Sequence, residues 1–261
     1  MAVLIALLQV LLGAGLLYHY VLLIAGSLPH RRLGESENSG SQLRFAIVVP
    51  AHNEASVIGE TVASMQRQRY MRGRFDVHVI ADHCDDATAS VARAAGAIVH
   101  ERRDLPRGRK AYPLAWAFDR LLRDEDNYDA LLVFDADSRP DHDFLSVMNQ
   151  AFSDGVRVVQ GRHVIANPEA SVFSALADAD MRLNNCLRNQ AKEALGLSAR
   201  LMGDAMGFRA EVLRRFPFGA ASLTEDREYG IYLMTQGVRV RYAPDAVSMG
   251  QAVSRWHDAT G

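Results

Sequence analysis

Residues 45–68 read FAIVVPAHNEASVIGETVASMQRQ and combine two periodicities. Phe45 to Val49 is an apolar run rich in β-branched residues, which is typical of a buried strand, and Pro50 closes it. A helical pattern follows from Ala55 to Gln68. We therefore predict a strand, a turn and a helix here, as the first unit of a folded domain.

The same order of patterns recurs through the next hundred residues. Alternating strands and helices of this length predict an α/β fold, with a mainly parallel sheet covered by helices on both faces. Ligands of such sheets bind beyond the carboxyl ends of the strands. The further predicted strands are Val77–Ala81, Ala97–His100, Ala130–Phe134 and Arg157–Gln160, and the helices are Asp86–Ala95, Lys110–Leu122 and His142–Phe152.

The alternation ends near residue 170. Ser171–Leu195 has the apolar spacing of one long helix, and a Gly- and Met-rich segment, LMGDAMGF, follows it. A second helix is predicted over Glu225–Thr235, with Gly237 as its stop signal and a strand over Val238–Tyr242.

The N-terminus carries an uncharged apolar run from Ala2 to Ala25. About 20 helical residues span a bilayer, and a signal peptide usually has a basic start and a shorter apolar run, so we predict a retained transmembrane helix over residues 1–28. A buried core helix is the alternative. Arg31 and Arg32 follow the run, which places the C-terminal side in the cytoplasm. A polar linker over 29–43, a folded domain over 44–250 and a tail over 251–261 complete the predicted organisation.

Charge and cysteine content exclude some classes of function. The formal net charge is -2, so no basic field indicates nucleic acid as a partner. Cys84 and Cys186 are the two cysteines, and they form neither a metal-ligand cluster nor a disulfide framework in sequence. Both are expected to be ordinary small side chains.

Acidic side chains follow the predicted strands. The clearest case is VFDADS at residues 133–138, where an apolar strand leads directly into Asp135 and Asp137. Two carboxylates at a strand end suit a hard cation and leave room for phosphate oxygens. A solvated turn with a helix cap is the alternative.

Two further segments have both a chemical and an ordinary interpretation. Thr224, Glu225 and Asp226 begin a predicted helix, where they either cap it or place a carboxylate in the site. Arg107 to Lys110 enters another helix, where its cations either bind phosphate or form a solvated loop.

Taken together and in order, these motifs resemble family 2 glycosyltransferases of the GT-A fold, in particular membrane-anchored bacterial cellulose-synthase-like and N-acetylglucosaminyltransferase-type enzymes. The resemblance covers residues 45 to 250. Its motifs are PAHNE at 50–54, ADHCDDAT at 81–88, GRKAYPL at 108–114, DAD at 135–137, GDAMGF at 203–208 and TED at 224–226.

The resemblance implies roles for individual residues. The nucleotide sugar is bound by Pro50, Asn53, Glu54, Asp82, Lys110 and Asp135, with Glu54 and Asp82 at the uridine or ribose and Lys110 at the diphosphate. Asp135 and Asp137 hold Mg²⁺ or Mn²⁺, Asp226 is the catalytic base, and Glu225, Gly207 and Phe208 border the acceptor.

The expected function is that of an inverting glycosyltransferase at the inner membrane, single-pass, with its catalytic domain in the cytoplasm. It would move a sugar from a nucleotide-diphosphate sugar, a UDP-sugar by expectation, to a carbohydrate or lipid-linked acceptor. The alternative is a catalytically inactive nucleotide-sugar-binding or scaffolding subunit. The chain departs from processive relatives at their Gln-x-x-Arg-Trp motif. Gln251, Arg255 and Trp256 approximate this motif, but there is one residue too many between Gln251 and Arg255.

Overall fold

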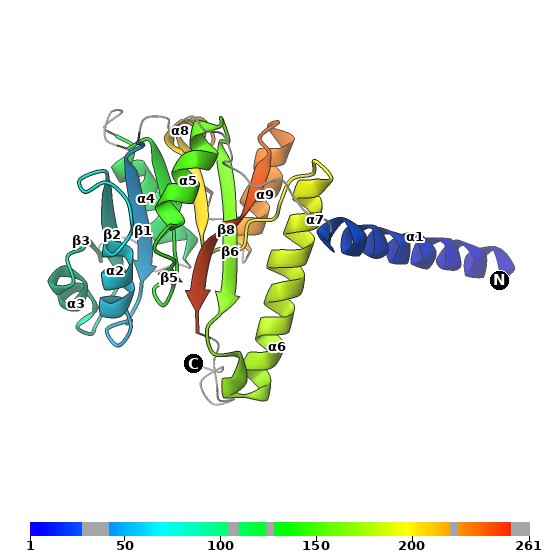
Figure 1. The fold of residues 1–261 in the computed structure, drawn as a ribbon, viewed down its shortest axis with the longest axis horizontal. Helices are drawn as coiled ribbons and strands as arrows, with labels where there is room; N and C mark the ends of the chain where they lie inside the picture. Colours follow the sequence, from blue (N-terminus) through cyan, green and yellow to red (C-terminus); the bar gives the residue numbers. More distant parts are fainter. Residues whose placement is uncertain (28–41, 104–109, 124–127, 220–223, 252–261) are drawn as a thin grey trace.

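The computed structural model describes residues 1–27, 42–103, 110–123, 128–219 and 224–251. Most of the predicted linker, the basic residues Arg107 to Arg109 and the tail after Gln251 lie outside these ranges. An α/β body holds a central sheet, and one long helix projects from its side (Figure 1). The α/β architecture predicted from the sequence is confirmed.

Eight strands form one sheet in the order β3-β2-β1-β4-β7-β6-β8-β5. The first four in this order are parallel, and β6 and β8 run in the same direction as they do, as the predicted mainly parallel sheet requires. Strand β7, antiparallel to both β4 and β6, and strand β5, antiparallel to β8, make the sheet mixed. The strands are β1 Phe45–Ala51, β2 Phe75–Asp82, β3 Ile98–Arg102, β4 Ala130–Val133, β5 Arg139–Pro140, β6 Val158–Ile165, β7 Met206–Arg209 and β8 Val240–Gly250.

Helices cover both faces of the sheet, as predicted. Residues of β1 alternate between two cores, with Ala46 and Val48 in one and Phe45, Ile47 and Val49 in the other. The helices are α2 Ile58–Gln66, α3 Thr88–Ala94 and α5 Phe144–Ser153 against one core, and α4 Ala111–Leu121, α8 Ala210–Arg215 and α9 Glu225–Thr235 against the other.

The predicted long helix after residue 170 is continuous but not uniform. It comprises α6 Val172–Met181, a π-helical turn η2 Arg182–Leu187, and α7 Arg188–Ala194, preceded by a short 3₁₀ turn η1 Pro168–Ala170. The predicted helix α9 has the expected bounds, and Gly237 ends it with a positive φ of 71°. The sequence patterns did not predict β5, β7 or α8.

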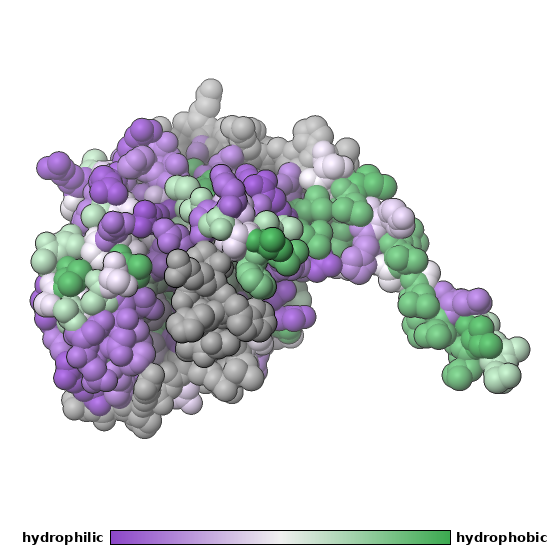
Figure 2. All heavy atoms as spheres, turned by 90° about the horizontal axis from the view of Figure 1, so that it is seen from below, coloured by the Kyte–Doolittle hydropathy of each residue, from purple (hydrophilic) through white to green (hydrophobic). Residues whose placement is uncertain are grey.

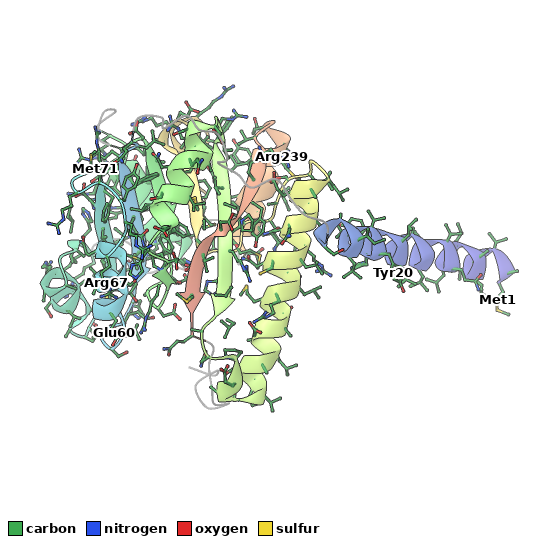
Figure 3. The ribbon with its side chains drawn as sticks, in the orientation of Figure 1. Met1, Tyr20, Glu60, Arg67, Met71 and Arg239 are labelled. Carbon is green, nitrogen blue, oxygen red and sulfur yellow. The ribbon has the colours of Figure 1, made fainter. Side chains whose placement is uncertain are left out.

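Helix α1, Ala2–Ser27, is long and apolar enough to cross a membrane, a test that a signal sequence also passes. Only its last turns contact the body, where Leu22 and Ala25 pack against Ala191 of α7. The rest of α1 projects away from the body (Figure 3), although His19 Nε2 lies 3.3 Å from Arg188 Nη2.

Candidate active site

The carboxyl ends of β1, β2 and β4 open into one crevice with a volume of about 1000 Å³. This position follows from the parallel strands, whose carboxyl ends meet at one edge of the sheet. Six of the residues implied by the resemblance line it, together with Gln251 at the end of β8: Pro50, Glu54, Asp82, Lys110, Asp135 and Asp137.

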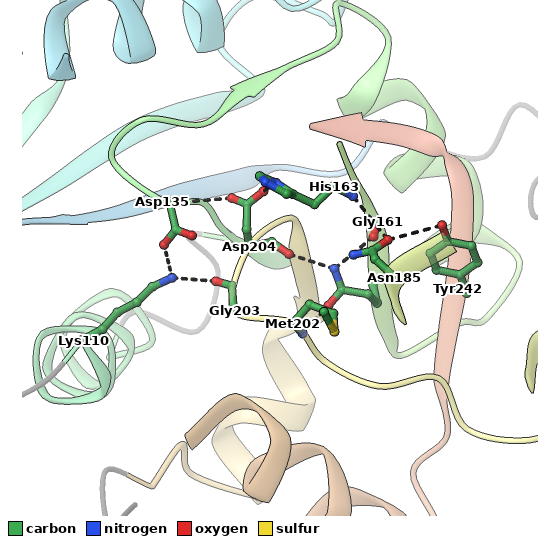
Figure 4. Close-up of polar contacts among 10 residues, drawn as sticks. Lys110, Asp135, Gly161, His163, Asn185, Met202, Gly203, Asp204 and Tyr242 are labelled. Carbon is green, nitrogen blue, oxygen red and sulfur yellow. Dashed lines mark hydrogen bonds and ion pairs between the residues drawn. The ribbon is translucent and has the colours of Figure 1, made fainter. Parts of the chain in front are cut away.

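Lys110 lies at the N-cap position of α4 and links two sides of this crevice. Its Nζ donates a hydrogen bond to Oδ1 of Asp135 and another, at 2.7 Å, to the carbonyl oxygen of Gly203 (Figure 4). The ammonium group therefore stands beside the first carboxylate after β4, where a diphosphate would find a cation.

Asp226, in the first turn of α9, faces the same point. A Cβ atom built on Gly203 would lie 3.7 Å from Asp226 Oδ2 and 3.7 Å from Lys110 Nζ. Gly203 has a φ of +83°, so glycine is suited to this position by backbone conformation as well as by space. The fold thus brings Asp226 close to Lys110, which lines the crevice, although about ninety residues separate Asp226 from Asp135.

A buried carboxylate that the sequence analysis did not select holds the loop of Asp135. Asp204 is 3% exposed, its Oδ1 accepts a hydrogen bond from the Asp135 N–H at 3.0 Å, and its Oδ2 lies 2.5 Å from Nδ1 of His163. Burial opposes a charge on His163, but the hydrogen bond to Asp204 and the charge of Asp204 raise the pKa of the imidazole.

Gln160, also unselected, fixes the segment before Asp204. Its side chain is fully buried, accepts from the Met202 N–H at 2.9 Å and donates to the Asp204 carbonyl at 2.8 Å. A buried amide between β6 and this segment is visible only after the strands are placed, and no sequence spacing indicates it.

The two acids expected near the nucleoside differ in environment. Asp82 is buried, and its Oδ1 accepts from Arg102 Nη1 at 2.5 Å and faces His83 Nδ1 at 2.9 Å. Burial and the neighbouring charge of Asp137 raise the pKa of Glu54. Removing the crevice's negative charge would therefore favour the ionised form of Glu54.

Three of the predicted site residues lie elsewhere. Asn53 is exposed next to the crevice, and its Oδ1 accepts from the Asp85 N–H at 2.9 Å, joining the loops after β1 and β2. Gly207 and Phe208 are buried in β7, with Phe208 packed between Phe118 and Tyr229. Both belong to the core, so Phe208 offers no exposed side chain to an acceptor, and the position of these residues at the border of the acceptor site stays a prediction.

The remaining acceptor-side residue, Glu225, precedes Asp226 in the first turn of α9. Thr224 occupies the N-cap position, but its side chain makes no capping hydrogen bond to the helix. Thr224 therefore does not cap α9 through its side chain, whereas Glu225, Asp226 and Glu228 do lie in the first turn, where negative charge suits the helix dipole.

The donor atoms around Asp135 fit a divalent cation that is shared with a ligand. Asp135 and Asp137 offer hard oxygen ligands at one end of the crevice, whereas the described residues contain no group of three or more His, Cys, Asp or Glu side chains that would enclose a metal. Two carboxylates leave coordination positions for phosphate oxygens and water, as Mg²⁺ and Mn²⁺ require.

A comparison with protein families matches residues 42–259 to a model described as glycosyltransferase like family 2. Among curated proteins, the chain is similar to the probable glycosyltransferase YdaM of Bacillus subtilis (strain 168), with 22% identity over 260 residues and 92% of this chain. The chain spans 60% of the length of that relative.

Solved structures share the fold. The mannosyltransferase PcManGT from Pyrobaculum calidifontis, in complex with GDP-Man and Mn²⁺, has a TM-score of 0.72 and 22% identity, over 98% of this chain and 69% of that one. Glucosyl-3-phosphoglycerate synthase from Mycobacterium tuberculosis, with Mn²⁺, UDP-glucose and phosphoglyceric acid, has a TM-score of 0.57 and 19% identity, over 89% and 80%.

A third structure, S. aureus TarS 1-349 in complex with UDP-GlcNAc, has a TM-score of 0.58 and 17% identity, over 84% of this chain and 61% of that one. These likenesses confirm the predicted GT-A fold.

Proposed function

The chain belongs to the glycosyltransferase like family 2, and we propose that it transfers a sugar from a nucleotide-diphosphate sugar to a hydroxyl acceptor. The observation that carries this proposal is the meeting of Lys110, Asp135 and Asp226 around Gly203. Such a transfer needs a cation, a carboxylate that can bind a metal ion, and a second carboxylate that can act as a base.

The donor occupies the crevice along β1 and β2 in this proposal. Pro50 and Asp82 line the part next to the nucleoside, and Lys110 lies where the diphosphate would need a positive charge. We propose UDP as the nucleotide. Two of the three similar structures hold uridine nucleotide sugars and one holds GDP-Man, so the fold accommodates both classes in those proteins.

Asp135 and Asp137 would hold Mg²⁺ or Mn²⁺, which when bound neutralises the charge that develops on the leaving diphosphate. Lys110 contributes in the same direction, because its ammonium group already contacts Asp135 and can turn to a phosphate oxygen. Asp204 and Gln160 keep the backbone on both sides of this point in place.

Asp226 is proposed as the base. It would take the proton from the acceptor hydroxyl while the oxygen forms a bond to C1 and the bond from C1 to the diphosphate breaks. One displacement of this kind inverts the anomeric centre. A positioned carboxylate typically contributes about 10² to 10⁴ in rate.

The proposed location is the inner membrane, with α1 as a single span and residues 44–250 as a cytoplasmic catalytic domain. The uncharged apolar helix followed by Arg31 and Arg32 supports this orientation. The acceptor would be a carbohydrate or a glycolipid of the cell surface. Protease added outside intact cells should leave residues 33–43 intact, and cleavage there would overturn the orientation.

A panel of nucleotide sugars tests the function directly. We expect the full chain in detergent to bind one UDP-sugar in the presence of Mn²⁺ and to release UDP when an acceptor is added. Binding without any turnover over a broad acceptor panel would favour the alternative, an inactive nucleotide-sugar-binding or scaffolding subunit. Failure to bind any nucleotide sugar would overturn the proposal.

A further inference from the structure

The long helix α6–η2–α7 turns polar side chains toward the body and large apolar side chains outward. Its inward side chains are polar, and Ser174, Asn185 and Asn189 are each 0% exposed. Its exposed side chains include large apolar ones, with Val172 74% and Leu176 63% exposed, beside the charged Asp180 and Arg182. A surface helix of a water-soluble body ordinarily buries the apolar side and exposes the polar one.

The polar inward side is fixed by specific hydrogen bonds. The Asn189 side chain accepts from the Arg200 N–H at 2.8 Å and donates to the Arg200 carbonyl at 3.0 Å. Asn185 Oδ1 accepts from the His163 N–H at 3.3 Å and from the Tyr242 hydroxyl at 3.4 Å. Rotating the helix to hide its apolar residues would break these bonds, so the outward face needs an apolar environment of its own.

The outward residues form one stripe along the helix: Val172, Leu176, Leu183, Leu187 and Ala191, at spacings of four or seven residues. Helix α1 already covers one end of this stripe. Leu22 and Ala25 pack on Ala191, and Gly26 lies so close to Leu187 that a Cβ atom there would be 2.6 Å from Leu187 Cδ1.

From this contact α1 runs crosswise to α6–α7 and away from the body (Figure 1). The apolar surface of α1 continues onto the body where the two meet, as the green spheres in Figure 2 show. If α1 crosses a membrane, the bare end of the stripe, with Val172, Leu176 and Leu183, lies alongside that membrane and not in the solvent beyond the body.

Cations gather beside the same contact. Arg188 Nη2 lies 3.3 Å from His19 Nε2 of α1, and Lys192 is one turn further along α7. Burial lowers the pKa of Lys192, and the charges of Arg200, Arg188 and Arg227 act in the same direction. Within the described ranges, none of the four has an ion pair with a carboxylate. Uncompensated cations next to an apolar helix match the anionic phosphates of lipid headgroups.

We propose that the outward face of α6–η2–α7 rests in the headgroup and upper acyl region of the bilayer that α1 spans, with Arg188 and Lys192 at lipid phosphates. This inference rests on the proposed membrane span. A lipid surface accounts for the apolar stripe, for its continuity with α1 and for the cations at their junction. A protein partner would have to account for each of these separately.

The contact has a consequence for the site. Asn189 ties the membrane-facing helix to Arg200, and the segment that follows supplies Gly203 and Asp204 to the crevice. The helix on the bilayer thus sets the height of the crevice above the lipid, where a membrane-bound acceptor would be presented.

Spin labels on single cysteines test the proposal in the full chain, reconstituted in nanodiscs, with Cys84→Ala and Cys186→Ala as the background. Leu176→Cys and Leu183→Cys report the stripe, Leu8→Cys reports the proposed span, and Met71→Cys reports the far side of the body (Figure 3). We expect oxygen to reach the labels at 176 and 183, as at 8, and the water-soluble relaxant NiEDDA to reach them several-fold less than at 71.

Each other pattern overturns the proposal in a recognisable way. Labels at 176 and 183 as accessible to NiEDDA as at 71, with a lipid-protected label at 8, would refute the contact but leave the span standing. A label at 8 that is open to NiEDDA would refute the span as well. Labels shielded from both reagents would indicate a protein partner or a second copy instead of lipid.

The charge contribution is tested by changing the lipid. Phosphatidylglycerol in place of part of the phosphatidylcholine should lower NiEDDA access at 183, and Arg188→Gln with Lys192→Gln should remove that gain. Arg182→Gln is the matched control, because Arg182 already pairs with Asp178 at 2.6 Å on the same helix. Equal access in both lipids, or an equal loss in the control, would overturn the headgroup assignment.

Discussion

The buried carboxylate of Asp204 accepts a hydrogen bond from the backbone N–H of Asp135 at 3.0 Å. One acidic residue thereby sets the position of another that is proposed to bind the metal, across a gap of 69 residues in sequence. The second oxygen of Asp204 faces His163 at 2.5 Å, so the carboxylate is buried between two fixed partners. The strand-end loop is therefore held in place before any donor arrives.

Asp204→Ala should destabilise the fold and loosen the donor site together. Removing one partner of a buried, hydrogen-bonded pair typically costs about 3–5 kcal/mol, because the other partner is left unpaired. Urea denaturation followed by far-UV circular dichroism measures the stability, and calorimetry with UDP and Mn²⁺ measures the donor affinity. Asp154→Ala, at an exposed acid after α5, is the control; a stability equal to that of the control would contradict the proposed role of Asp204.

Donor binding should require a divalent cation, because Asp135 and Asp137 leave coordination positions that only ligand or water oxygens fill. We expect UDP to bind the wild-type chain much more tightly in Mn²⁺ than in EDTA. Asp137→Ala should weaken the binding in Mn²⁺ and remove most of this difference. Equal affinities for both proteins in both buffers would rule out the metal assignment.

Asp226→Asn should abolish transfer but leave UDP affinity nearly unchanged, since a base acts only as the acceptor attacks. The expected loss in kcat is about 10² to 10⁴, the range of a general base. Glu228→Gln, an exposed acid of the same helix, is the matched control for a change of charge on α9. Substantial turnover by the Asn variant would place the base elsewhere.

The sequence predicted those parts of the molecule that repeat a local pattern. Strands β1 to β4 are apolar runs that alternate with helical patterns, so the sequence identified them, and the strand-end rule then collected Glu54, Asp82 and Asp135 at one edge. Strand β7 lies outside this alternation, and it pairs with β4 and β6 in the antiparallel sense. Its pairing depends on partners far away in sequence, so no local pattern revealed it.

The same limit applies to His163 and Asp204. Asp204 lies in the GDAMGF motif, but His163 lies in none, and the two become partners only when β6 and the segment before β7 are side by side. Gly207 and Phe208 show a related limit: a motif resemblance indicates that a residue type recurs, and it does not distinguish a place beside the acceptor from a place in the core.

Gly207→Ala distinguishes these two places for Gly207. A Cβ atom at this position would lie 2.9 Å from Leu132 Cδ2 and 3.0 Å from Phe152 Cζ, so the core has no space for it. Overpacking of this kind typically costs about 1–3 kcal/mol. We expect a lower melting temperature with an unchanged KM for the acceptor at a temperature where the variant is folded. A raised KM without any loss of stability would restore the acceptor-side interpretation.

A buried histidine cluster on β2 should make stability depend on pH. His78 Nδ1 lies 3.0 Å from His100 Nε2, and His78 Nε2 lies 2.8 Å from the hydroxyl of Tyr128, which donates to Asp76 at 2.9 Å. Burial, reinforced by the charge of His100, lowers the pKa of His78 from 6.5 to about 4. Below pH 6.5 His78 is therefore protonated in the unfolded chain, whereas in the native protein it stays neutral down to about pH 4.

The contribution of His78 is fully present above pH 6.5 and is lost as the pH falls toward 4, and the shift corresponds to about 3 kcal/mol. His78→Gln keeps hydrogen-bonding groups at this position but cannot titrate, so its free energy of unfolding should fall less than that of the wild type between pH 6.5 and 4. Tyr128→Phe removes a neighbouring hydrogen bond and leaves His78 titratable, so it should be less stable throughout but retain the slope. Urea denaturation at several pH values measures all three proteins. If the unfolding free energy of His78→Gln falls with pH as steeply as that of the wild type, the acid sensitivity originates from groups other than His78.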